Sequence, residues 1–385
     1  MMKKRLGDIA SFQRGLTYSK GDEAPLSSKC VLRSNNIDLD SSTLDLTEIK
    51  CLREDFVIPE DKKLKANSIF MCMSNGSKQH VGKVAFIDKD MDYAFGGFMG
   101  LVIPLPEVSA KYVFYACRSS AYRSFLSQVG NGIGITNLRF SDLEKFEIPL
   151  PSLSNQQRIV AELDLLSGIV EKKNAQLRTL DELASTIFYE MFGDPVSNDR
   201  KWPTAKMNEV APQKVYAGAI PAKDGKHWLL NLDMVESQTG RVIEKALFSP
   251  AEIGNSTTTF NEDNVLYSKL RPYLNKVVLP DEPGYCTSEL VPLLPKNGVI
   301  NRLFLTYLLR SKFFVEYINA RVAGAKMPRV TMSDFREFDV ILPPIALQES
   351  FADRICVIEK QKKIINDSIP PAKELLSSRM DKYFC

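Results

Sequence analysis

The chain has 385 residues, a length that favours two domains or more over a single core. Apolar residues make up 44% of it and charged residues 25%, which describes a globular protein and excludes a disordered one. The formal net charge is only +3, so any binding of nucleic acid has to come from local patches and not from a basic chain overall.

Targeting and redox signals favour the cytoplasm. The chain starts MMKKRLGDIA, without the apolar stretch of a signal peptide, and no run approaches the roughly 18 apolar residues of a membrane span. The seven cysteines include no CxxC pair and are odd in number, which is typical of free thiols in a reducing compartment. His80 and His227 are the only histidines, so a zinc site is not expected.

The first half of the chain begins with strand-like runs and ends in helices. The runs ANSIFMCM, from Ala66, and GKVAFID, from Gly82, have the composition of strands. An amphipathic helix is predicted over 111–129, and a glycine-containing loop, GNGIGITNL, follows it. Ser141 and Glu144 have the S-x-x-E spacing of a capping box, which predicts that Ser141 caps a short helix.

A long heptad seam follows the short helix. Apolar residues recur in a 4-3 pattern at ten positions from Ile159 to Met191, among which Lys173 is the one exception. The pattern stops at FGDP, where Gly193 and Pro195 are strong helix terminators. The sequence therefore predicts one long helix whose apolar stripe needs a partner.

The second half repeats this order of elements. Strand-like runs at 263–270 and 274–280 precede an amphipathic helix predicted over 302–320, and the loop AGAKMPRV follows. A weaker similarity opens the two halves, where RLGDIA at Arg5 resembles KMNEVA at Lys206 at an offset of 201. The two halves therefore share their order of elements from beginning to end.

The repeat is clearest where each half ends. Residues 140–163 align with residues 332–355 without a gap, at an offset of 192. Of the 52 positions from 112 to 163, ten are identical in the two halves, including Gln156 and its counterpart Gln348. Because this period exceeds the roughly 20–50 residues of a solenoid repeat, the chain contains a duplicated domain.

The same offset places a second heptad seam from Phe351 to Leu376. Pro370 and Pro371 are predicted to break or kink this helix, with Ser368 as the cap of a new segment, which leaves open how far the helix continues. We expect the two stripes to pair as an antiparallel coiled coil, and a generic dimerisation helix is the alternative. A helix of about 38 residues spans roughly 57 Å, which suits two readers of half-sites one or two duplex turns of about 34 Å apart.

This layout resembles that of the specificity subunits of type I restriction-modification systems over nearly the whole chain. The resemblance rests on IPLPSLSNQQRIVAEL from Ile148, FYEMFGDP from Phe188 and ILPPIALQESFADRI from Ile341. It implies an α+β fold, with two duplicated mixed α/β target-recognition domains joined by two long helices that form an antiparallel coiled coil with pseudo-twofold symmetry. The implied bounds are 1–150 and 196–345 for the target-recognition domains, and 151–195 and 346–385 for the conserved helical spacers.

The resemblance also implies a function and partners. The chain would recognise a bipartite, asymmetric target in double-stranded DNA, one half-site per domain. Two methyltransferase subunits and the restriction subunits, which are motor-nucleases, would assemble on it to methylate adenine and to cleave unmodified DNA. The chain itself would be non-catalytic and would bind no metal or cofactor, because S-adenosylmethionine, ATP and Mg are expected on the partner subunits.

Motifs of catalysis do not fit the sequence. GSKQHVGK at Gly76 has five residues between its glycines, one more than a phosphate-binding loop, and Val84 stands where Ser or Thr would bind magnesium. GNGIGIT at Gly130 follows a helix and lacks the third glycine of a dinucleotide fingerprint. Two alternatives remain, namely a self-contained methyltransferase or nuclease with degenerate motifs and a protein scaffold that binds no DNA.

Residues for reading DNA are sought among polar loops, although polar loops are usually only solvated. Bases are read by Arg, Lys, Asn and Gln side chains, and phosphates by cations and backbone amides. The glycine loops at 132–137 and 324–329 recur at the same place in both halves, whereas Tyr115 and Tyr307 repeat among helical neighbours and are expected in the core. The candidates are Gln13, Arg14, Arg33, Asn35, Asn36, Ser74, Asn75, Lys78, Gln79, Asn137 and Arg139 in the first half, and Lys214, Tyr216, Asn231, Lys269, Arg271, Lys326 and Arg329 in the second.

Overall fold

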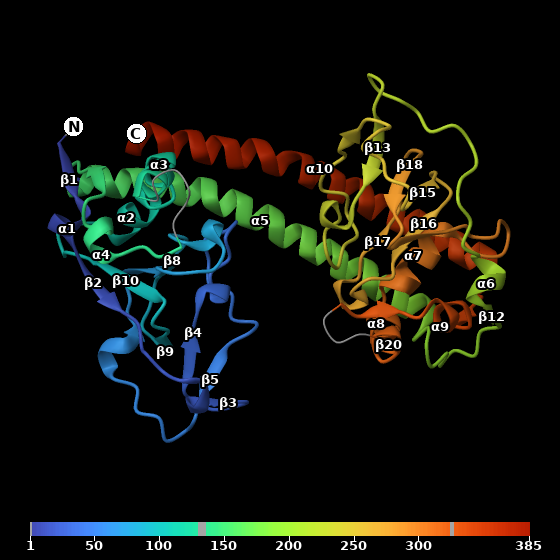
Figure 1. Cartoon of the computed structure of the whole chain (residues 1–385), viewed down its shortest axis with the longest axis horizontal. Coiled ribbons are helices and arrows are strands. Elements are labelled where there is room, and N and C mark those ends of the chain that lie inside the picture. The colour runs from blue at the N-terminus through green and yellow to red at the C-terminus, as the bar shows by residue number, and fades with distance from the viewer. Residues whose placement is uncertain (1, 130–135, 324–326) are drawn as a thin grey trace. The chain divides into compact units, whose positions relative to one another are not determined.

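A computed structural model describes residues 2–129, 136–323 and 327–385 of the chain (Figure 1). It is a mixed helical and sheet protein in which the two longest helices each follow a globular part. None of the helices in the described ranges combines the length and the apolarity that crossing a bilayer requires.

The chain divides into two compact units. Unit 1 comprises Met1–Asn174 and Asn366–Cys385, and unit 2 comprises Ala175–Ile365. Each unit therefore contains one globular part and one portion of each long helix, α5 (Leu153–Phe192) and α10 (Ile345–Phe384).

The globular part of unit 1 is closed by its own ends. β1 (Lys3–Arg5) pairs antiparallel with β11 (Glu147–Pro149), the last strand before α5. The other elements are α1 (Leu6–Ile9), β2 (Ala10–Arg14), η1 (Lys20–Asp22), β3 (Glu23–Ala24), β4 (Cys30–Leu32), η2 (Ser34–Asn36), β5 (Lys50–Leu52), η3 (Glu60–Lys62), β6 (Lys63–Leu64), β7 (Ser68–Cys72), η4 (Lys78–His80), β8 (Val84–Ile87), β9 (Met91–Phe95), β10 (Met99–Pro104), α2 (Ala110–Ala116), α3 (Ser120–Val129) and α4 (Phe140–Leu143). They form one sheet of order β2-β10-β7-β8 and another of order β3-β5-β4-β9-β6.

The globular part of unit 2 is closed in the same way. β12 (Thr204–Lys206) pairs antiparallel with β22 (Asp339–Ile341), the last strand before α10. The other elements are α6 (Met207–Val210), β13 (His227–Leu230), η5 (Leu232–Met234), β14 (Leu247–Phe248), β15 (Thr257–Phe260), β16 (Val265–Ser268), η6 (Pro272–Leu274), β17 (Val277–Val278), β18 (Gly284–Thr287), β19 (Leu290–Leu293), α7 (Arg302–Arg310), α8 (Lys312–Asn319), β20 (Val322–Ala323), β21 (Arg329–Val330) and α9 (Met332–Arg336). The sheets have the orders β14-β13-β18-β15, β17-β16-β19 and β20-β21.

Strand pairing confirms the duplication that the sequence repeat predicts. In unit 1, β7 lies between β10 and β8, and β4 pairs parallel with β9. In unit 2, β16 lies between β19 and β17, and β13 pairs parallel with β18. The four predicted strand-like runs contain β7, β8, β16 and β17, whose residues are largely buried because apolar side chains point to both faces of these strands.

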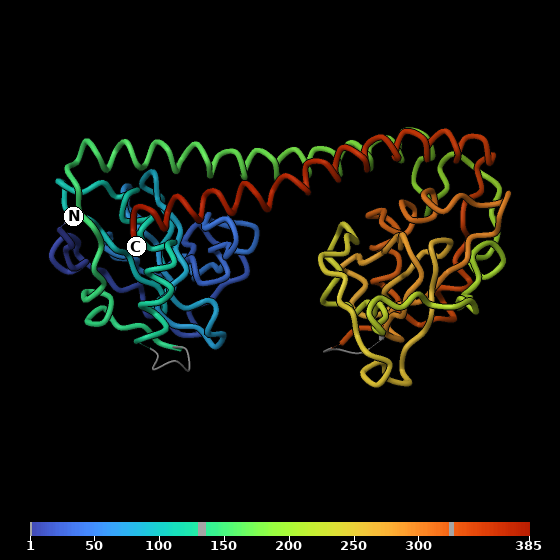
Figure 2. Tube along the Cα trace, turned by 90° about the horizontal axis from the view of Figure 1, so that it is seen from above, coloured from blue at the N-terminus to red at the C-terminus, as the bar shows by residue number. Residues whose placement is uncertain are grey.

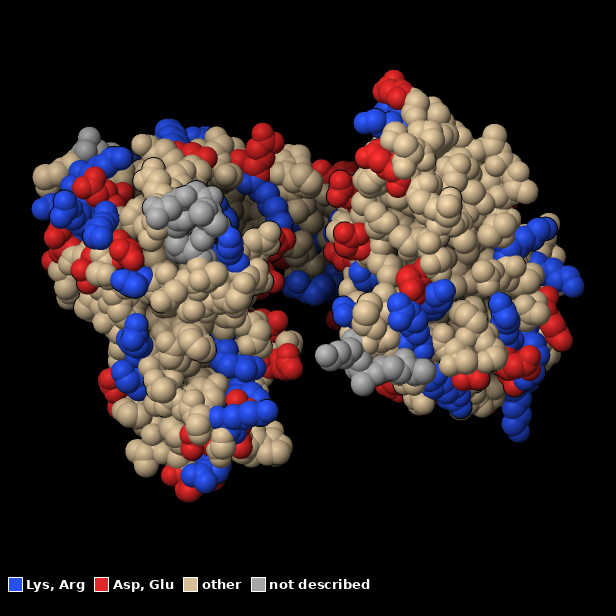
Figure 3. All heavy atoms as spheres, viewed as in Figure 1, with Lys and Arg blue, Asp and Glu red and all other residues tan. Residues whose placement is uncertain are grey.

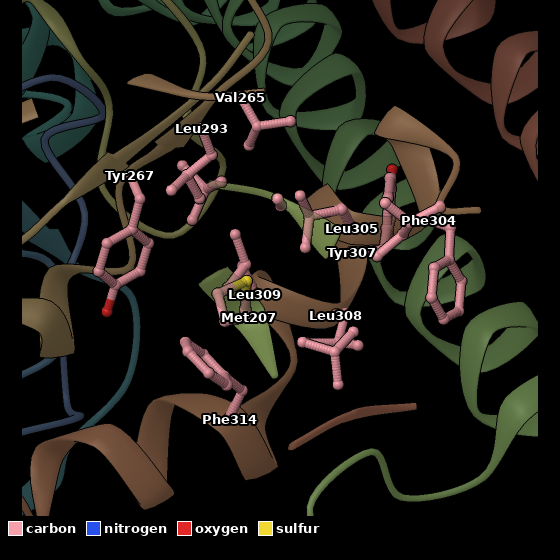
Figure 4. Packing of buried hydrophobic residues seen from close by; sticks show 14 of the residues in the cluster. Met207, Val265, Tyr267, Leu293, Phe304, Leu305, Tyr307, Leu308, Leu309 and Phe314 are labelled. Carbon is pink, nitrogen blue, oxygen red and sulfur yellow. The ribbon is translucent and has the colours of Figure 1, made fainter. Parts of the chain in front are cut away.

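Each unit has a core in which a helix of the globular part meets the sheet and the long helices. In unit 2, Leu305 and Leu309 of α7 lie in one buried cluster with Val265, Met207 and Phe314 (Figure 4). Phe188 of α5 and Phe351 of α10 belong to the same cluster, with ring centroids 5.6 Å apart. The long helices are therefore continuous with the globular core and not merely attached to it.

The prediction of one continuous amphipathic helix over 111–129, and of another over 302–320, is wrong in one respect. A buried serine divides each of them into two helices. Ser119 separates α2 from α3, and Ser311 separates α7 from α8. The Ser119 and Ser311 hydroxyls accept hydrogen bonds from the amides of Tyr122 and Phe314, at 3.3 and 3.2 Å. A serine that caps a new helix competes with helix continuation, which the apolar periodicity does not reveal.

The predicted capping box at Ser141 is also absent. α4 begins at Phe140, so that Arg139 occupies the cap position without a side-chain cap hydrogen bond. The equivalent helix α9 begins at Met332 after Thr331, again without a side-chain cap hydrogen bond. The sequence spacing was right for a box, but the helix starts one residue before the serine.

The two long helices run antiparallel within each unit (Figure 2). In unit 1, Glu162 of α5 accepts a hydrogen bond from Tyr383 of α10 at 2.6 Å, and Lys173 donates to Ser368 at 2.7 Å. In unit 2, Lys362 of α10 forms an ion pair of 2.7 Å with Asp181 of α5. The predicted long helices and their antiparallel pairing are confirmed, and each of the two lysines that interrupt an apolar seam has a polar partner on the other helix.

The break predicted at Pro370 and Pro371 is absent, because α10 is one helix from Ile345 to Phe384. Each proline lacks the N–H that would bond to the carbonyl four residues earlier, so the helix loses two hydrogen bonds but is not interrupted. Both prolines are exposed, which leaves room for their rings. Beyond them, Leu376, Met380 and Phe384 are buried in the core of unit 1, and this packing holds the segment in place.

Candidate nucleic-acid interface

Three separate segments meet at one edge of unit 1. The amide of Met73 donates to the carbonyl of Phe98 at 2.9 Å, and the amide of Leu138 donates to the carbonyl of Met73 at 2.7 Å. The amide of Asn75 donates to the carbonyl of Thr136 at 3.1 Å. We call these segments (73–75, 98 and 136–138) the frame of unit 1.

The same three segments meet in unit 2 through the same kind of bonds. The amide of Lys269 donates to the carbonyl of Glu289 at 3.0 Å, and the amide of Val330 donates to the carbonyl of Lys269 at 2.8 Å. The amide of Arg271 donates to the carbonyl of Pro328 at 2.7 Å. These segments (269–271, 289 and 328–330) are the frame of unit 2, in which Arg271, Glu289 and Arg329 take the places of Asn75, Phe98 and Asn137.

The frame of unit 1 surrounds a hollow of about 480 Å³. Four of the residues predicted to bind DNA line it, namely Arg14, Ser74, Asn75 and Asn137. The structure thus brings together candidates that are more than 120 positions apart in the sequence. Arg14 and Asn137 are exposed, whereas Asn75 is half-buried. The side-chain amide of Asn75 donates to Ser34 at 2.6 Å and accepts from the amide of Ser77 at 2.8 Å.

Cationic side chains dominate the frame of unit 2. Nη2 of Arg329 lies 3.1 Å from Oε1 of Glu289, and Nε lies 3.2 Å from the same oxygen. Arg271 is exposed and has a φ of 50°, a conformation that is uncommon outside glycine and asparagine. Lys269 is half-buried beside them. This edge of unit 2 therefore offers guanidinium groups where unit 1 offers amides.

The remaining candidates of unit 1 lie around the frame. Gln13 precedes Arg14 on β2, and the segment of Arg33 and Asn35 is tied to the frame through the bond between Ser34 and Asn75. Asn36 is only 1% exposed and its amide bonds to the backbone of Arg33, Asp45 and Glu48, so this residue serves the fold and cannot face a ligand. The other candidates are all exposed, and these are Lys78, Gln79 and Arg139.

The remaining candidates of unit 2 are more scattered. Lys214 lines a second hollow, also of about 480 Å³, together with Gln213 and Arg336. The amide of Tyr216 donates to the carbonyl of Thr259 at 3.2 Å, and the Thr259 hydroxyl donates to the carbonyl of Tyr216. Asn231 precedes η5 without a side-chain cap hydrogen bond. Lys326 lies outside the residues that the structure describes.

Two frame residues were missed by the sequence analysis. Phe98 lines the hollow of unit 1 with 73% of its surface exposed. Glu289 holds Arg329 in unit 2. A signal was present in the run FGGFMG, where an aromatic residue follows two glycines between strand-like runs. Residue type alone does not select Phe98, because the side chains that usually read bases are polar.

Local charges match the low net charge. Figure 3 shows Lys and Arg side chains interspersed with Asp and Glu on the visible face of each unit.

Close to the candidates Lys78 and Gln79, partial burial and the nearby Lys83 lower the pKa of His80, so its imidazole is neutral at physiological pH. Any attraction of DNA phosphates at this place therefore depends on lysine and arginine, not on histidine.

A buried glutamine fixes each globular part to its long helix. Gln156 of α5 accepts from the amide of Ser109 at 2.9 Å and donates to the carbonyl of Pro151 at 2.9 Å. Gln348 of α10 accepts from the amide of Asn301 at 2.8 Å and donates to the carbonyl of Pro343 at 2.8 Å. This shared role explains why the two glutamines are identical in the repeat.

The repeated tyrosines Tyr115 and Tyr307 are buried, as expected. Their hydroxyls bond to Asp164 of α5 at 2.7 Å and to Glu359 of α10 at 2.9 Å. Burial raises the pKa of both phenols, and so do these carboxylates, so the hydroxyls remain donors. The frames are thus carried on globular parts that are locked to rigid helices, as a binding site requires.

The chain thus contains two copies of one fold, each with a frame at its edge and a long helix at its end. The chain matches the family described as Type I restriction modification DNA specificity domain over residues 1–179 and 251–370, more than half of its length. It therefore belongs to the family of type I restriction-modification specificity subunits.

Individual relatives agree with this membership. The chain is similar to the StySPI specificity subunit of Salmonella potsdam, with 24% identity over 405 residues, 97% of this chain and 84% of the relative. It is 27% identical to the EcoKI specificity subunit of Escherichia coli (strain K12) over 192 residues, 49% of this chain and 40% of the relative. The crystal structure of a type I S subunit from M. genitalium shares the fold, with a TM-score of 0.56 at 15% identity over 100% of this chain and 96% of that chain.

Proposed function

We propose that each unit of this specificity subunit reads one half of a bipartite, asymmetric DNA target. The observation that carries the proposal is the pair of frames, which share their backbone bonds and differ in their side chains. A repeated backbone frame gives both units the same way of approaching a duplex, and different side chains give them different base preferences. Two unlike readers in one chain predict a target with two unlike halves.

The test is an exchange of one unit. Residues 196–345 are replaced by the equivalent segment of a relative with a known target, and the chimera is expressed with its methyltransferase subunit. Methylome sequencing is expected to show that one half of the modified motif changes completely while the other half is retained. A motif that changes in both halves, or in neither, contradicts the assignment of one half-site to one unit.

The chain is proposed to act through its partners and to be non-catalytic by itself. S-adenosylmethionine would be bound by the methyltransferase subunits, and ATP and Mg by the restriction subunits. Purified chain alone is expected to bind random duplex DNA in a gel-shift assay, which a pure protein scaffold would not. It is expected to transfer no methyl group until a methyltransferase subunit is added, and turnover by the chain alone would contradict this.

The long helices supply two equivalent surfaces for two methyltransferase subunits. Leu165 of α5 and Val357 of α10 are exposed and stand 192 positions apart, the offset of the repeat. Leu183 and Leu375 form a second exposed pair at the same offset. Exposed apolar residues that recur in register with a duplication suit two copies of one partner.

Single substitutions separate the two surfaces. Leu165→Asp and Val357→Asp are each expected to leave one methyltransferase copy bound in place of two. The double variant is expected to bind none, and native mass spectrometry counts the copies. Val57→Asp is the control, because Val57 is also an exposed apolar residue but lies outside the long helices. Retention of two copies by the double variant would place the docking surface elsewhere.

A further inference from the structure

Arg329 of the unit 2 frame is held by a carboxylate in a defined orientation. Glu289 accepts from Nε and Nη2 of Arg329, at 3.2 and 3.1 Å. The Arg329 side chain is 47% exposed and that of Glu289 is 24% exposed, so the guanidinium lies further out than the group that holds it. The edge formed by Nη1 and the second hydrogen of Nη2 has no partner among the residues that the structure describes.

The ligand for this edge follows from charge and shape. A guanidinium that presents two parallel donors matches O6 and N7 of guanine in the major groove. A phosphate group would also accept these bonds, but the carboxylate of Glu289 would repel it, whereas the edge of a base carries no net charge. Because Glu289 restricts the arginine before binding, less conformational freedom is lost on contact.

The equivalent place in unit 1 has a different chemistry. Asn137 is exposed where unit 2 has Arg329, and Phe98 is exposed where unit 2 has Glu289. An asparagine amide pairs with N6 and N7 of adenine, and a phenylalanine ring makes apolar contact with the methyl group of thymine. The two side chains therefore suit one A·T pair, in which Asn137 would contact the adenine of one strand and Phe98 the thymine of the other.

We infer that the two frames read different base pairs: Arg329, held by Glu289, contacts the guanine of a G·C pair in the second half-site, and Asn137 with Phe98 contacts an A·T pair in the first. The inference rests on the proposed function, since it assigns bases to the half-sites that the two units are proposed to read. Arg329, Asn137 and Phe98 are thus specificity-determining residues.

The first experiment compares two arginine variants in the complex with the methyltransferase subunit. Arg329→Lys keeps the charge and loses the planar pair of donors. It is expected to relax one position of the second half-site, a G·C pair in the parent motif, with discrimination there falling between about fivefold and a hundredfold. Arg241→Lys is the matched control, because Arg241 forms an ion pair with Glu236 at 2.8 Å and is 45% exposed but lies outside the frame. Its methylome is expected to equal that of the parent.

The second experiment uses a synthetic duplex of the parent motif in which deoxyuridine replaces thymidine in the first half-site. Loss of the methyl group is expected to weaken binding of the parent protein about fourfold and to leave binding by Phe98→Ala unchanged. Relaxation by Arg329→Lys at an A·T pair or in the first half-site, or an equal effect of deoxyuridine on both proteins, would overturn the base assignment. A parent protein that modifies no bipartite motif would instead overturn the proposed function.

Discussion

The junction with the long helices is nearly the same in both units, whereas the frames differ at their exposed side chains. Gln156 and Gln348 make equivalent bonds. Each accepts from the amide of the residue that caps a helix of the globular part, and each donates to the carbonyl of a proline just before its own long helix. In the frames, Asn137 in unit 1 has Arg329 as its equivalent in unit 2. The bonds that the two frames share join main-chain atoms, so a side chain can change there without the loss of a shared bond. The residues that support a globular part and the side chains proposed to recognise DNA are therefore separable within one domain.

The largest effect is expected at the junction. Gln348→Ala leaves the amide of Asn301 and the carbonyls of Pro343 and Val299 without their partner in a buried place. Each such group costs about 1–3 kcal/mol, so the free energy of unfolding is expected to fall by about 3 kcal/mol or more. Gln156→Ala removes two bonds where Gln348→Ala removes three, and a smaller loss of about 2 kcal/mol is expected.

Urea denaturation of the chain followed by circular dichroism measures both losses. Gln157→Ala is the control, since Gln157 is the exposed neighbour of Gln156 and its replacement is expected to change the unfolding free energy by less than about 0.5 kcal/mol. A loss for Gln156→Ala and Gln348→Ala no larger than that of the control would show that the junction is not what supports the globular parts.

A substitution in the frame is expected to change stability less than one at the junction, and to weaken DNA binding. Arg271→Asn gives unit 2 the residue that unit 1 has at Asn75, and asparagine tolerates the positive φ of this position. Unfolding is expected to change by no more than about 0.5 kcal/mol, while affinity for a duplex of the parent motif falls about tenfold. Fluorescence anisotropy measures the affinity, and an unfolding loss comparable to that at the junction would contradict the separation of support from recognition.

The smallest effect is expected beside the frame. Lys214 stands in unit 2 at the place of Gln13 in unit 1, at the offset of 201 that relates the beginnings of the two halves. Lys214→Gln is expected to weaken binding of every duplex alike, by no more than about fivefold, and to reduce the slope of log affinity against log salt by about 0.9. Anisotropy at several salt concentrations measures the slope, and a change in the methylated motif would mean that Lys214 reads a base.

The long helices and the duplication could be predicted because their signal is periodic and repeated. The seam from Ile159 to Met191 lies within α5, and the repeat offset predicted α10. The continuity of α10 through Pro370 and Pro371 could not be predicted, since local helix rules hold only until tertiary packing outweighs two lost hydrogen bonds. Similarly, the apolar periodicity around Ser119 predicts a continuous helix, whereas in the structure its hydroxyl caps α3.

The candidate site was predictable in part. Polar residue type was enough to select Arg14, Ser74 and Asn137, which the fold brings to one hollow. It was not enough to exclude Asn36, whose amide is used by the backbone, because burial follows from the tertiary structure. Phe98 and Glu289 were missed for the opposite reason, since an aromatic and an acidic residue do not belong to the usual set of readers.

The pairing of the first and last strands of each globular part has a consequence for how such chains change. β1 with β11, and β12 with β22, bring the two ends of a globular part side by side. The chain therefore enters and leaves each globular part at neighbouring positions. Genetic recombination with breakpoints in these two strand pairs would transfer the sheets, the short helices and the frame of a globular part together, and only its contacts with the long helices would have to be matched by the recipient. Under the proposed assignment of one half-site to each unit, one crossover at each end would change half of the target in a single generation, whereas point mutations in the frame would change it one base pair at a time.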